Sequence, residues 1–553
     1  MQGDITVGRQ APPPRPGGPP GRGAHIPRRG QVPPPVLPAR GDLNDQLINT
    51  DFWTDRMVEA AGIPIVDVPF VTVGSGIGSF VTVDYLRVCG VPADQIAVLG
   101  PQDVPWRSYE YLTRCSQIPR HERLRSDSQS MPDNLWGFPS YAVREAWADK
   151  TIGPLWNVLT EPIIANYYTP RAGHAFESME AEAKRIDYYR SLHNGQVRMV
   201  RRRSGGGYFT LFTPKAGTSR TKRVAFRSRY VHVAIGYPGI KLLPDLQKYR
   251  ETYGDTARVV NAYEPHEVIY DSLRARPGTV IIRGAGIVAS RVLQRLIDDR
   301  DTYGLQTQIV HLFRTYVDKA HGPRLTMRRP GSHGWAYQGF NYPKSVWGGQ
   351  LKARMSKLEG YDRLALYKEI SGTNTPIRKD WQRQLKRGRA EGFYQVVVGT
   401  AETLRPATGR QGVIAGVRID PHAPIQQQSG PGGIREIHAD FVIDCTGLQA
   451  DVREHRLLAD LLDHTGAGLN PLGRMDVERD FELRGTRNGD GKVFCSGTAT
   501  LGGYFPGVDT FLGLQIAAQE IGDAVAADGF CERLTSARSV KQWWRWARSK
   551  GVD

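Results

Sequence analysis

The sequence predicts an α/β protein built from two Rossmann-like, three-layer units. Two patterns of strand, glycine turn and helix carry this prediction, one opening at Gly74 and the other at Gly284. In both places the turn follows a short apolar strand, and a second apolar strand comes after the helix. That order is how a parallel sheet covered by helices begins.

Composition and charge exclude several classes of protein. A chain of 553 residues has room for two to three domains. No run of about twenty apolar residues and no signal-like N-terminus occur, so we expect a cytoplasmic location. The five scattered cysteines contain no CxxC pair, which argues against a disulfide framework and against a metal centre. The net charge of +17 suits an anionic nucleotide. Nucleic acid is not expected, because no zinc finger or RNP-like motif is present.

The N-terminal part of the chain divides into a tail and the first unit. Residues 1–42 form a tail in which the stretch 11–40 holds eleven prolines, so we expect disorder there. A helical pattern follows from Asn44 to Ala61. The first unit then consists of a strand over Phe70–Val73, a helix ending at Val88, and a strand over Ile96–Leu99.

The middle of the chain changes to short strands of alternating hydrophobicity and then returns to the order of strand, glycine turn, helix and strand. Short alternating strands predict a hairpin around Ser204–Gly207, followed by a strand over Arg229–Ile235. The second unit has a strand over Thr279–Ile282, a helix over Ile287–Asp299 and a strand over Thr307–Phe313. A basic helical region is expected at 350–392, and further strands at Tyr394–Val398 and Ala439–Asp444.

The first glycine turn has the chemistry of a pyrophosphate site. Gly74 permits a tight turn and Gly76 lets a phosphate approach the backbone, and the motif, which also contains Gly78, opens a helix. Free N–H groups and the positive dipole end of the helix then face the anion. Ser79 replaces the third glycine of the usual pattern. The acidic residue expected after the next strand is missing, since Gly100 follows Leu99.

The second glycine turn repeats this arrangement with Gly284, Gly286 and Ala289. Its following strand ends at Arg314 and Thr315. A guanidinium and a hydroxyl at that position suit a ribose 2′-phosphate, which favours NADPH over NADH. The alternative is that Arg314 is an ordinary solvated arginine.

Three further apolar strands end in glycine: those before Gly236, Gly447 and Gly497. Thr498 follows the last of them, and a helix rich in alanine is predicted over Leu514–Ala526. Each strand taken alone indicates only a buried strand and a turn.

The order of these five segments resembles the two-dinucleotide flavoprotein superfamily over roughly residues 65–525. Within it, the segments 131–141, containing Trp136, and 339–344 are most similar to class B flavin monooxygenases of the lysine and ornithine N-hydroxylating type. The resemblance departs at Gly100, at Thr498, where a Gly-Asp pair is usual, and in the longer FxGxxxHxxxF/Y signature, which is absent. No redox CxxC or CxxxxC of the disulfide reductases occurs.

The resemblance implies that the NAD(P) domain is inserted into the FAD domain. We therefore expect a discontinuous FAD domain at 43–272 and 440–530. An NAD(P) domain with a helical insertion is expected at 273–439, and a C-terminal helix at 531–553. The implied contacts to FAD and NADPH form one set: Gly74, Gly76, Gly78, Ser79, Trp136, Gly236, Gly284, Gly286, Ala289, Arg314, Thr315, Gly447, Gly497 and Thr498.

The implied activity is hydride transfer from NADPH to FAD, followed by oxygen transfer to a small amine or another soft nucleophile. Molecular oxygen and a small-molecule substrate are the implied partners, and the cofactor supplies the chemistry. No catalytic residue is assigned; His333, Asn341 and Lys344 are candidate pocket residues without a role. Two alternatives stay open: an NAD(P)H-dependent flavoprotein reductase without oxygen insertion, and a non-catalytic nucleotide sensor.

The C-terminal segment predicts a basic amphipathic helix. Val540, Trp543, Trp544 and Ala547 share one face, and Lys541, Arg545 and Arg548 share another. We expect the tryptophans to dock on the protein's own core or on a second subunit of a homo-oligomer. Contact with a membrane surface is the alternative.

Overall fold

The computed structural model describes the chain from residue 41 to residue 552, with gaps. The described ranges are 41–123, 140–160, 168, 170–216, 221–314, 350–370, 379–408, 411–421, 433–449, 451–505 and 507–552. The predicted tail lies outside them except for its last two residues. Of those two, Asp42 pairs with Arg223 at 2.9 Å, so the last residue of the predicted tail belongs to the described fold.

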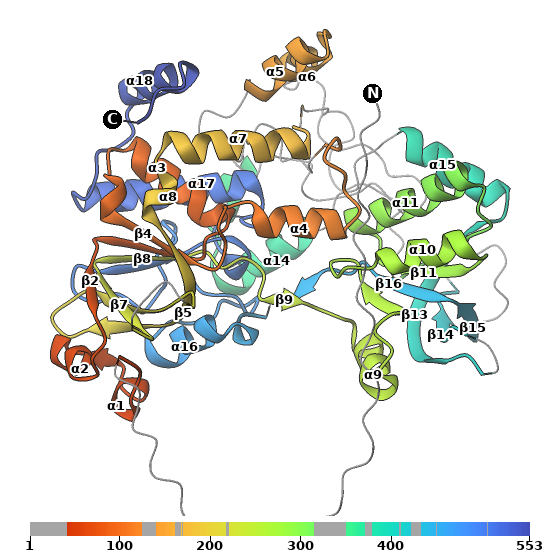
Figure 1. The fold of residues 1–553 in the computed structure, drawn as a ribbon, viewed down its shortest axis with the longest axis horizontal. Coiled ribbons are helices and arrows are strands. Elements are labelled where there is room, and N and C mark those ends of the chain that lie inside the picture. Colours follow the sequence, from red (N-terminus) through yellow and green to blue (C-terminus); the bar gives the residue numbers. More distant parts are fainter. Residues whose placement is uncertain are drawn as a thin grey trace, which may run out of the picture. The chain divides into compact units, whose positions relative to one another are not determined.

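The first sheet has nine strands, in the order β18-β8-β3-β4-β5-β6-β7-β2, with β1 beside β5. The pairs from β18 to β5 are parallel, and β5-β6-β7 continue as an antiparallel meander. Figure 1 labels several of these strands. Their bounds are β1 Phe52–Trp53, β2 Ile65–Asp67, β3 Phe70–Val73, β4 Ile96–Gly100, β5 Leu192–Arg203, β6 Tyr208–Pro214, β7 Val224–Ser228, β8 Tyr230–Val233 and β18 Lys492–Cys495.

The second sheet repeats this plan with seven strands, in the order β10-β16-β11-β12-β13-β14-β15. The pairs from β10 to β13 are parallel and the last two are antiparallel. The bounds are β10 Val259–Asn261, β11 Thr279–Arg283, β12 Gln308–Phe313, β13 Tyr394–Pro406, β14 Val413–Ile419, β15 Ile434–Ala439 and β16 Phe441–Asp444. The predicted α/β class with two Rossmann-like units is confirmed.

Helices cover both sheets. Around the first sheet lie α3 Ile77–Val88, α4 Arg107–Cys115, α7 Ala172–Arg185, α8 Tyr188–Ser191, α16 Arg456–His464 and α17 Phe511–Ala527. Helices α5 Ser140–Ala148 and α6 Gly153–Thr160 contact each other. With the second sheet go α9 Pro244–Tyr253, α10 Glu267–Ala275, α11 Ile287–Tyr303 and α15 Lys379–Ala390. The helices α13 Gln350–Met355, α14 Gly360–Ile370 and α18 Ser536–Ala547 complete the set named here.

Strand β11 shows why the second unit has three layers. Its side chains alternate, as the pleat of a strand requires. Val280 and Ile282 enter the core that includes α10, α11 and α15, whereas Ile281 enters a core shared with α9 and β14. An apolar run without polar breaks is therefore needed to fill both faces.

The predicted helix from Asn44 to Ala61 is wrong. Two short helices replace it, α1 Asp45–Ile48 and α2 Asp55–Ala60. Between them β1 pairs in parallel with Arg202 and Arg203 of β5. The Trp53 side chain is fully buried and donates from Nε1 to the Leu47 carbonyl oxygen at 3.0 Å. Pairing with a distant strand overrides the local helical pattern.

Two strands at the predicted domain limits belong to the second sheet. The limits at 272/273 and 439/440 place β10 and β16 with the first domain. Strand pairing instead places them beside β11, with Ile281 opposite Val442 and Val260 opposite Ile443. The exact limits of the domains stay a proposal, with the crossings moved outward to β9 (Gly239–Ile240) and β17 (Leu448–Gln449).

Candidate dinucleotide sites

The first glycine turn joins β3 to α3 under tight steric control. Gly74 has φ +103°, and a Cβ atom there would lie 2.9 Å from the Ala234 carbonyl carbon. A Cβ on Gly78 would meet the Ala234 side chain at 3.2 Å, because α3 lies close to the end of β8. Gly76 differs: no atom of the described residues lies within 4 Å of its Cβ position. The turn therefore packs tightly at Gly74 and Gly78 and is open at Gly76.

The start of α3 keeps its amide groups available. Gly76 is the N-cap residue, and no side chain caps the helix. The first N–H groups of a helix have no intrahelical partner, and they carry the positive end of the helix dipole. Two phosphate groups bridged by oxygen match such a site in charge and in hydrogen bonding.

A buried polar chain holds this turn in place. Thr72 of β3 donates to the Ser79 hydroxyl at 2.8 Å, and the His232 ring connects Thr72, at 3.0 Å, with Ser496, at 2.8 Å. Burial lowers the pKa of His232 to about 3, so the ring is neutral. A neutral imidazole has one N–H, so one ring nitrogen of His232 donates and the other accepts. Ser79 thus acts inside the protein rather than at the open side of the turn.

Gly100, the first departure from the flavoprotein pattern, has a steric cause. Ser75 of the turn packs against it: a Cβ atom on Gly100 would lie 2.8 Å from the Ser75 Cβ. The Ser75 hydroxyl also accepts from the Gln102 amide at 2.8 Å. An acidic side chain cannot occupy position 100 while Ser75 keeps this place.

The second glycine turn has the same construction. Gly284 has φ +109°, and a Cβ there would lie 2.9 Å from the Cys445 carbonyl oxygen. Gly286 is the N-cap of α11, again without a side-chain cap, and Ala289 is fully buried. The neutral His311 ring donates from Nε2 to the Gly284 carbonyl oxygen at 2.7 Å and accepts at Nδ1 from Tyr394 at 2.9 Å. Burial lowers its pKa to about 3.

The histidines His232 and His311 were missed by the sequence reasoning. A usable signal was present for His232, which is the one strongly polar side chain in the apolar strand Tyr230–Val233 before Gly236. His311 had no such signal, because its strand also contains Gln308 and ends at Arg314 rather than at a glycine turn. Both rings bind a turn to a neighbouring strand. They are positioning residues.

Arg314 follows β12 directly and its side chain is exposed. That is the strand end where the sequence places a ribose-phosphate contact. Thr315 and Trp136 lie outside the described residues, as do the candidate pocket residues His333, Asn341 and Lys344.

The two predicted crossings run side by side. Gly236 has φ +70° and Gly447 has φ +128°, and in the part of the chain that the structure describes no atom lies within 4 Å of either Cβ position. Just beyond them, β9 and β17 pair antiparallel, with Ile240 opposite Leu448 (Figure 1). The two connections between the sheets therefore form one hydrogen-bonded ribbon.

The loop after β18 brings the last predicted residues to the same sheet edge. Gly497, with φ +77°, and Thr498 begin a 3-10 turn, and Thr498 is buried. Helix α17 starts soon after; its N-cap Thr510 accepts from the Gly513 amide at 3.1 Å. Because β18, β8 and β3 are parallel neighbours, their carboxyl ends and Gly74, Gly236 and Gly497 lie along one edge.

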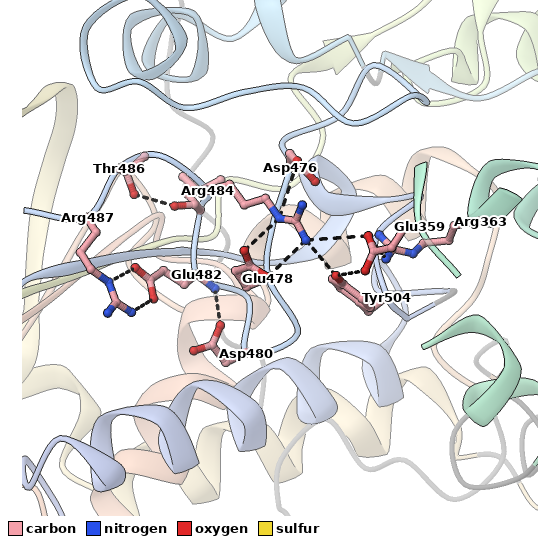
Figure 2. A network of polar contacts seen from close by, with 11 residues as sticks. Glu359, Arg363, Asp476, Glu478, Asp480, Glu482, Arg484, Thr486, Arg487 and Tyr504 are labelled. Atoms are coloured by element: carbon pink, nitrogen blue, oxygen red, sulfur yellow. Dashed lines mark hydrogen bonds and ion pairs between the residues drawn. The ribbon is translucent and has the colours of Figure 1, made fainter. Parts of the chain in front are cut away.

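A polar network joins the helical segment 350–370 to the region around β18 (Figure 2). The Tyr504 hydroxyl donates to Glu359 at 2.5 Å, and Arg484 donates to the same hydroxyl at 2.8 Å. Arg363 pairs with Glu359 at 2.7 Å and lies over the Tyr504 ring, 3.6 Å from its centroid. These hydrogen bonds and cations together hold the pKa of Glu359 below its usual value against the opposing effect of burial. The predicted helical insertion is thus divided, because α15 instead packs on the second unit through Leu385.

Among the described residues, no helix combines the length and the apolar character needed to cross a lipid bilayer. In the same part of the chain, no three His, Cys, Asp or Glu side chains gather as a metal site.

Neither a protein-family model nor a curated protein matches the sequence. Solved structures do match the fold. The ornithine hydroxylase of Pseudomonas aeruginosa is 17% identical, with a TM-score of 0.57 over 83% of this chain and 99% of its own. The ornithine N-hydroxylase of Kutzneria sp. 744, in a structure with reduced FAD, NADP+ and L-ornithine, is 12% identical, with a TM-score of 0.58 over 84% and 100%.

A third similar structure is the FAD-bound cadaverine monooxygenase of Erwinia amylovora. It is 13% identical, with a TM-score of 0.56 over 82% of this chain and 94% of its own. The chain therefore has the two-dinucleotide flavoprotein fold of these two ornithine hydroxylases and the cadaverine monooxygenase.

Proposed function

We propose that the protein is an FAD-dependent, NADPH-using monooxygenase that hydroxylates a small amine. The observation that carries the proposal is the pair of uncapped, glycine-opened helices, α3 and α11, in a fold shared with three amine-hydroxylating enzymes. FAD is assigned to the turn at Gly74 and NADPH to the turn at Gly284.

The residues present fit two dinucleotides. Gly76 is open where a pyrophosphate would approach the backbone. Glycine is the N-cap residue of both helices, so neither N-cap residue has a side chain that could occupy the amides. The crossing residues Gly236 and Gly447 are equally open. When bound, flavin accepts hydride from a nicotinamide and activates oxygen.

The chain's own residues bind and orient the two dinucleotides and exclude water from them. His311 binds the Gly284 carbonyl oxygen directly, and His232 acts on the first turn through the Thr72 hydroxyl, which bonds to Ser79. Both contacts help to preorganise the amides for phosphate. Arg314 is proposed to pair with the ribose 2′-phosphate of NADPH. The network around Glu359 holds the segment 350–370 against the region around β18.

The substrate class is taken from the similar structures. They act on ornithine and cadaverine, which both carry a primary amine. We propose a small primary amine for this protein as well.

The test begins with the absorption spectrum of the purified protein. A flavin spectrum that bleaches on adding NADPH without air supports both cofactor assignments. NADPH oxidation is then followed in air with ornithine, lysine or cadaverine, and hydroxylamine product is measured. Product formed in proportion to NADPH supports the proposal.

Other outcomes select the alternatives. NADPH oxidation with hydrogen peroxide and no product from any amine, together with rapid reduction of a quinone, identifies a reductase. A colourless protein that takes up no added FAD overturns the proposal and favours a nucleotide sensor.

A further inference from the structure

The segment that follows α17 lies against the end of α3. The Glu532 amide donates to the Cys89 carbonyl oxygen at 3.2 Å, and Arg538 of α18 donates from Nε to the Val88 carbonyl oxygen at 2.9 Å. The C-terminal helix is therefore anchored in part by a basic side chain. The expectation that its tryptophans dock on the protein's own core is wrong for Trp544, which is 53% exposed.

Two cysteines meet at this contact. Cys89 is the C-cap residue of α3 and is 1% exposed, whereas Cys531 is half-buried. Their thiols are hydrogen-bonded to each other, and Cys531 Sγ also lies 3.9 Å from the Gly522 carbonyl oxygen of α17. Contact between two sulfur atoms whose backbones run side by side is the arrangement that a disulfide needs.

The two thiols differ in acidity. The hydrogen bond from Cys89 and the nearby Arg538 cation lower the pKa of the Cys531 thiol, against the opposing effects of burial and of the acidic Asp523 and Glu532. The same hydrogen bond, together with burial, raises the pKa of the Cys89 thiol. Because the thiolate is the reactive form, Cys531 is the nucleophile of the pair and Cys89 is the sulfur held in reserve behind it.

The other three cysteines are less suited to react. Cys115, Cys445 and Cys495 are all buried, and burial raises the pKa of each thiol, to about 12 for Cys495. Among the five cysteines, Cys531 is thus the most accessible and the one that ionises most readily.

We propose that Cys531 and Cys89 form a dithiol site that hydrogen peroxide oxidises to a disulfide. A peroxide is small enough to reach a half-buried sulfur atom, and neither cysteine belongs to the two dinucleotide sites. Closing the disulfide ties the C-terminal segment to α3, and a thiol reductant releases it.

The reaction has two steps. The Cys531 thiolate attacks one peroxide oxygen, the O–O bond breaks, and the other oxygen leaves as hydroxide, which the proton lost by Cys531 converts to water. The Cys89 sulfur then displaces the hydroxyl of the Cys531 sulfenic acid: the S–S bond forms, the S–O bond breaks, and the hydroxyl leaves as water with the Cys89 proton. Two thiols are oxidised by two electrons in all, and one peroxide is reduced to two water molecules.

The test treats the purified full-length protein with hydrogen peroxide. NADPH is left out, so the outcome does not depend on the proposed monooxygenase activity. Free thiols are counted after denaturation with a thiol-reactive dye, and linked peptides are identified by mass spectrometry. The variants Cys531→Ser and Cys89→Ser are compared with the matched control Cys115→Ser, and thermal unfolding checks that each folds. A parallel wild-type sample receives glutathione disulfide in place of the peroxide.

The proposal predicts that the wild-type protein falls from five free thiols to three, that the linked peptides contain Cys89 and Cys531, and that dithiothreitol restores both thiols. Cys115→Ser should also lose two thiols, whereas Cys531→Ser should lose none. In Cys89→Ser the sulfenic acid cannot close to a disulfide, so dimedone, which labels sulfenic acids, should label Cys531 more strongly than in the wild type.

The wild-type peptide map decides the matter even where a variant fails to fold. A wild-type protein that keeps all five thiols, or that links a different pair, overturns the proposal. Oxidation of Cys531 to a sulfinic acid without linkage to Cys89 overturns it as well. Linkage of the pair by glutathione disulfide but not by hydrogen peroxide would refute the choice of oxidant.

Discussion

Alanine at Gly74 and at Gly76 should separate folding from cofactor binding. At Gly74, the backbone angle of +103° costs an L residue about 1–2 kcal/mol. Forcing a Cβ to within 2.9 Å of the Ala234 carbonyl carbon costs about 1–3 kcal/mol more. Gly74→Ala should thus destabilise the protein by about 3 kcal/mol.

Gly76→Ala should behave in the opposite way. Its φ of −90° suits any residue, and nothing lies near the added methyl group. The loss of glycine at an N-cap costs no more than about 1 kcal/mol. The methyl group would, however, stand where we place the pyrophosphate, so FAD affinity should fall at least about tenfold, or 1.4 kcal/mol.

The assay measures unfolding by denaturant on flavin-free protein, because bound FAD would itself raise the stability. FAD is then titrated into each variant while the quenching of flavin fluorescence is followed. Wild-type affinity in Gly76→Ala would refute the assignment of the open position to the phosphates. Wild-type stability in Gly74→Ala would refute the steric account of the turn.

Four further predictions follow from the same geometry. His232 and His311 are neutral in the folded protein and take up protons only on unfolding. Protonation of each in the unfolded chain should therefore lower the free energy of unfolding by about 2 kcal/mol between pH 7 and pH 5. Denaturant unfolding at both pH values measures this loss. The loss begins below the unfolded pKa of about 6.5 and ends near pH 3. Gly100→Asp should fail to improve FAD affinity and should lower the melting temperature, because Ser75 fills the space. Tyr504→Phe should cost about 1 kcal/mol in denaturant unfolding, the value of one net hydrogen bond. Arg314→Ala should raise the KM for NADPH at least about tenfold and leave that for NADH nearly unchanged, as expected when a charged pair is removed.

The strand–turn–helix units were predictable because their signals are local. The predicted strand Phe70–Val73 matches β3, and the helix predicted to end at Val88 does so. A glycine turn and an apolar run between two turns can each be recognised from residues that are close together in the sequence. The hairpin around Ser204–Gly207 was found for the same reason.

Features set by distant contacts were not predictable. β1 exists because it pairs with β5, about 150 residues later in the chain. Caps at Asn44 and Thr54 mark the two separate helix starts and could have warned against one long helix. The cause of Gly100 is visible only once Ser75 is seen against it.

The β9–β17 ribbon makes the second unit an insertion whose two ends lie side by side. The chain enters it at Ile240 and leaves it at Leu448, and these residues are direct partners across an antiparallel pair. A segment whose two ends meet can be deleted, inserted or exchanged by reconnecting the chain at one place, and the strand order of the first sheet does not change. Such an exchange would sacrifice the bonds that Glu359 and Arg363 make to Tyr504 and Arg484. Those contacts would therefore make one particular second unit fit one particular first unit.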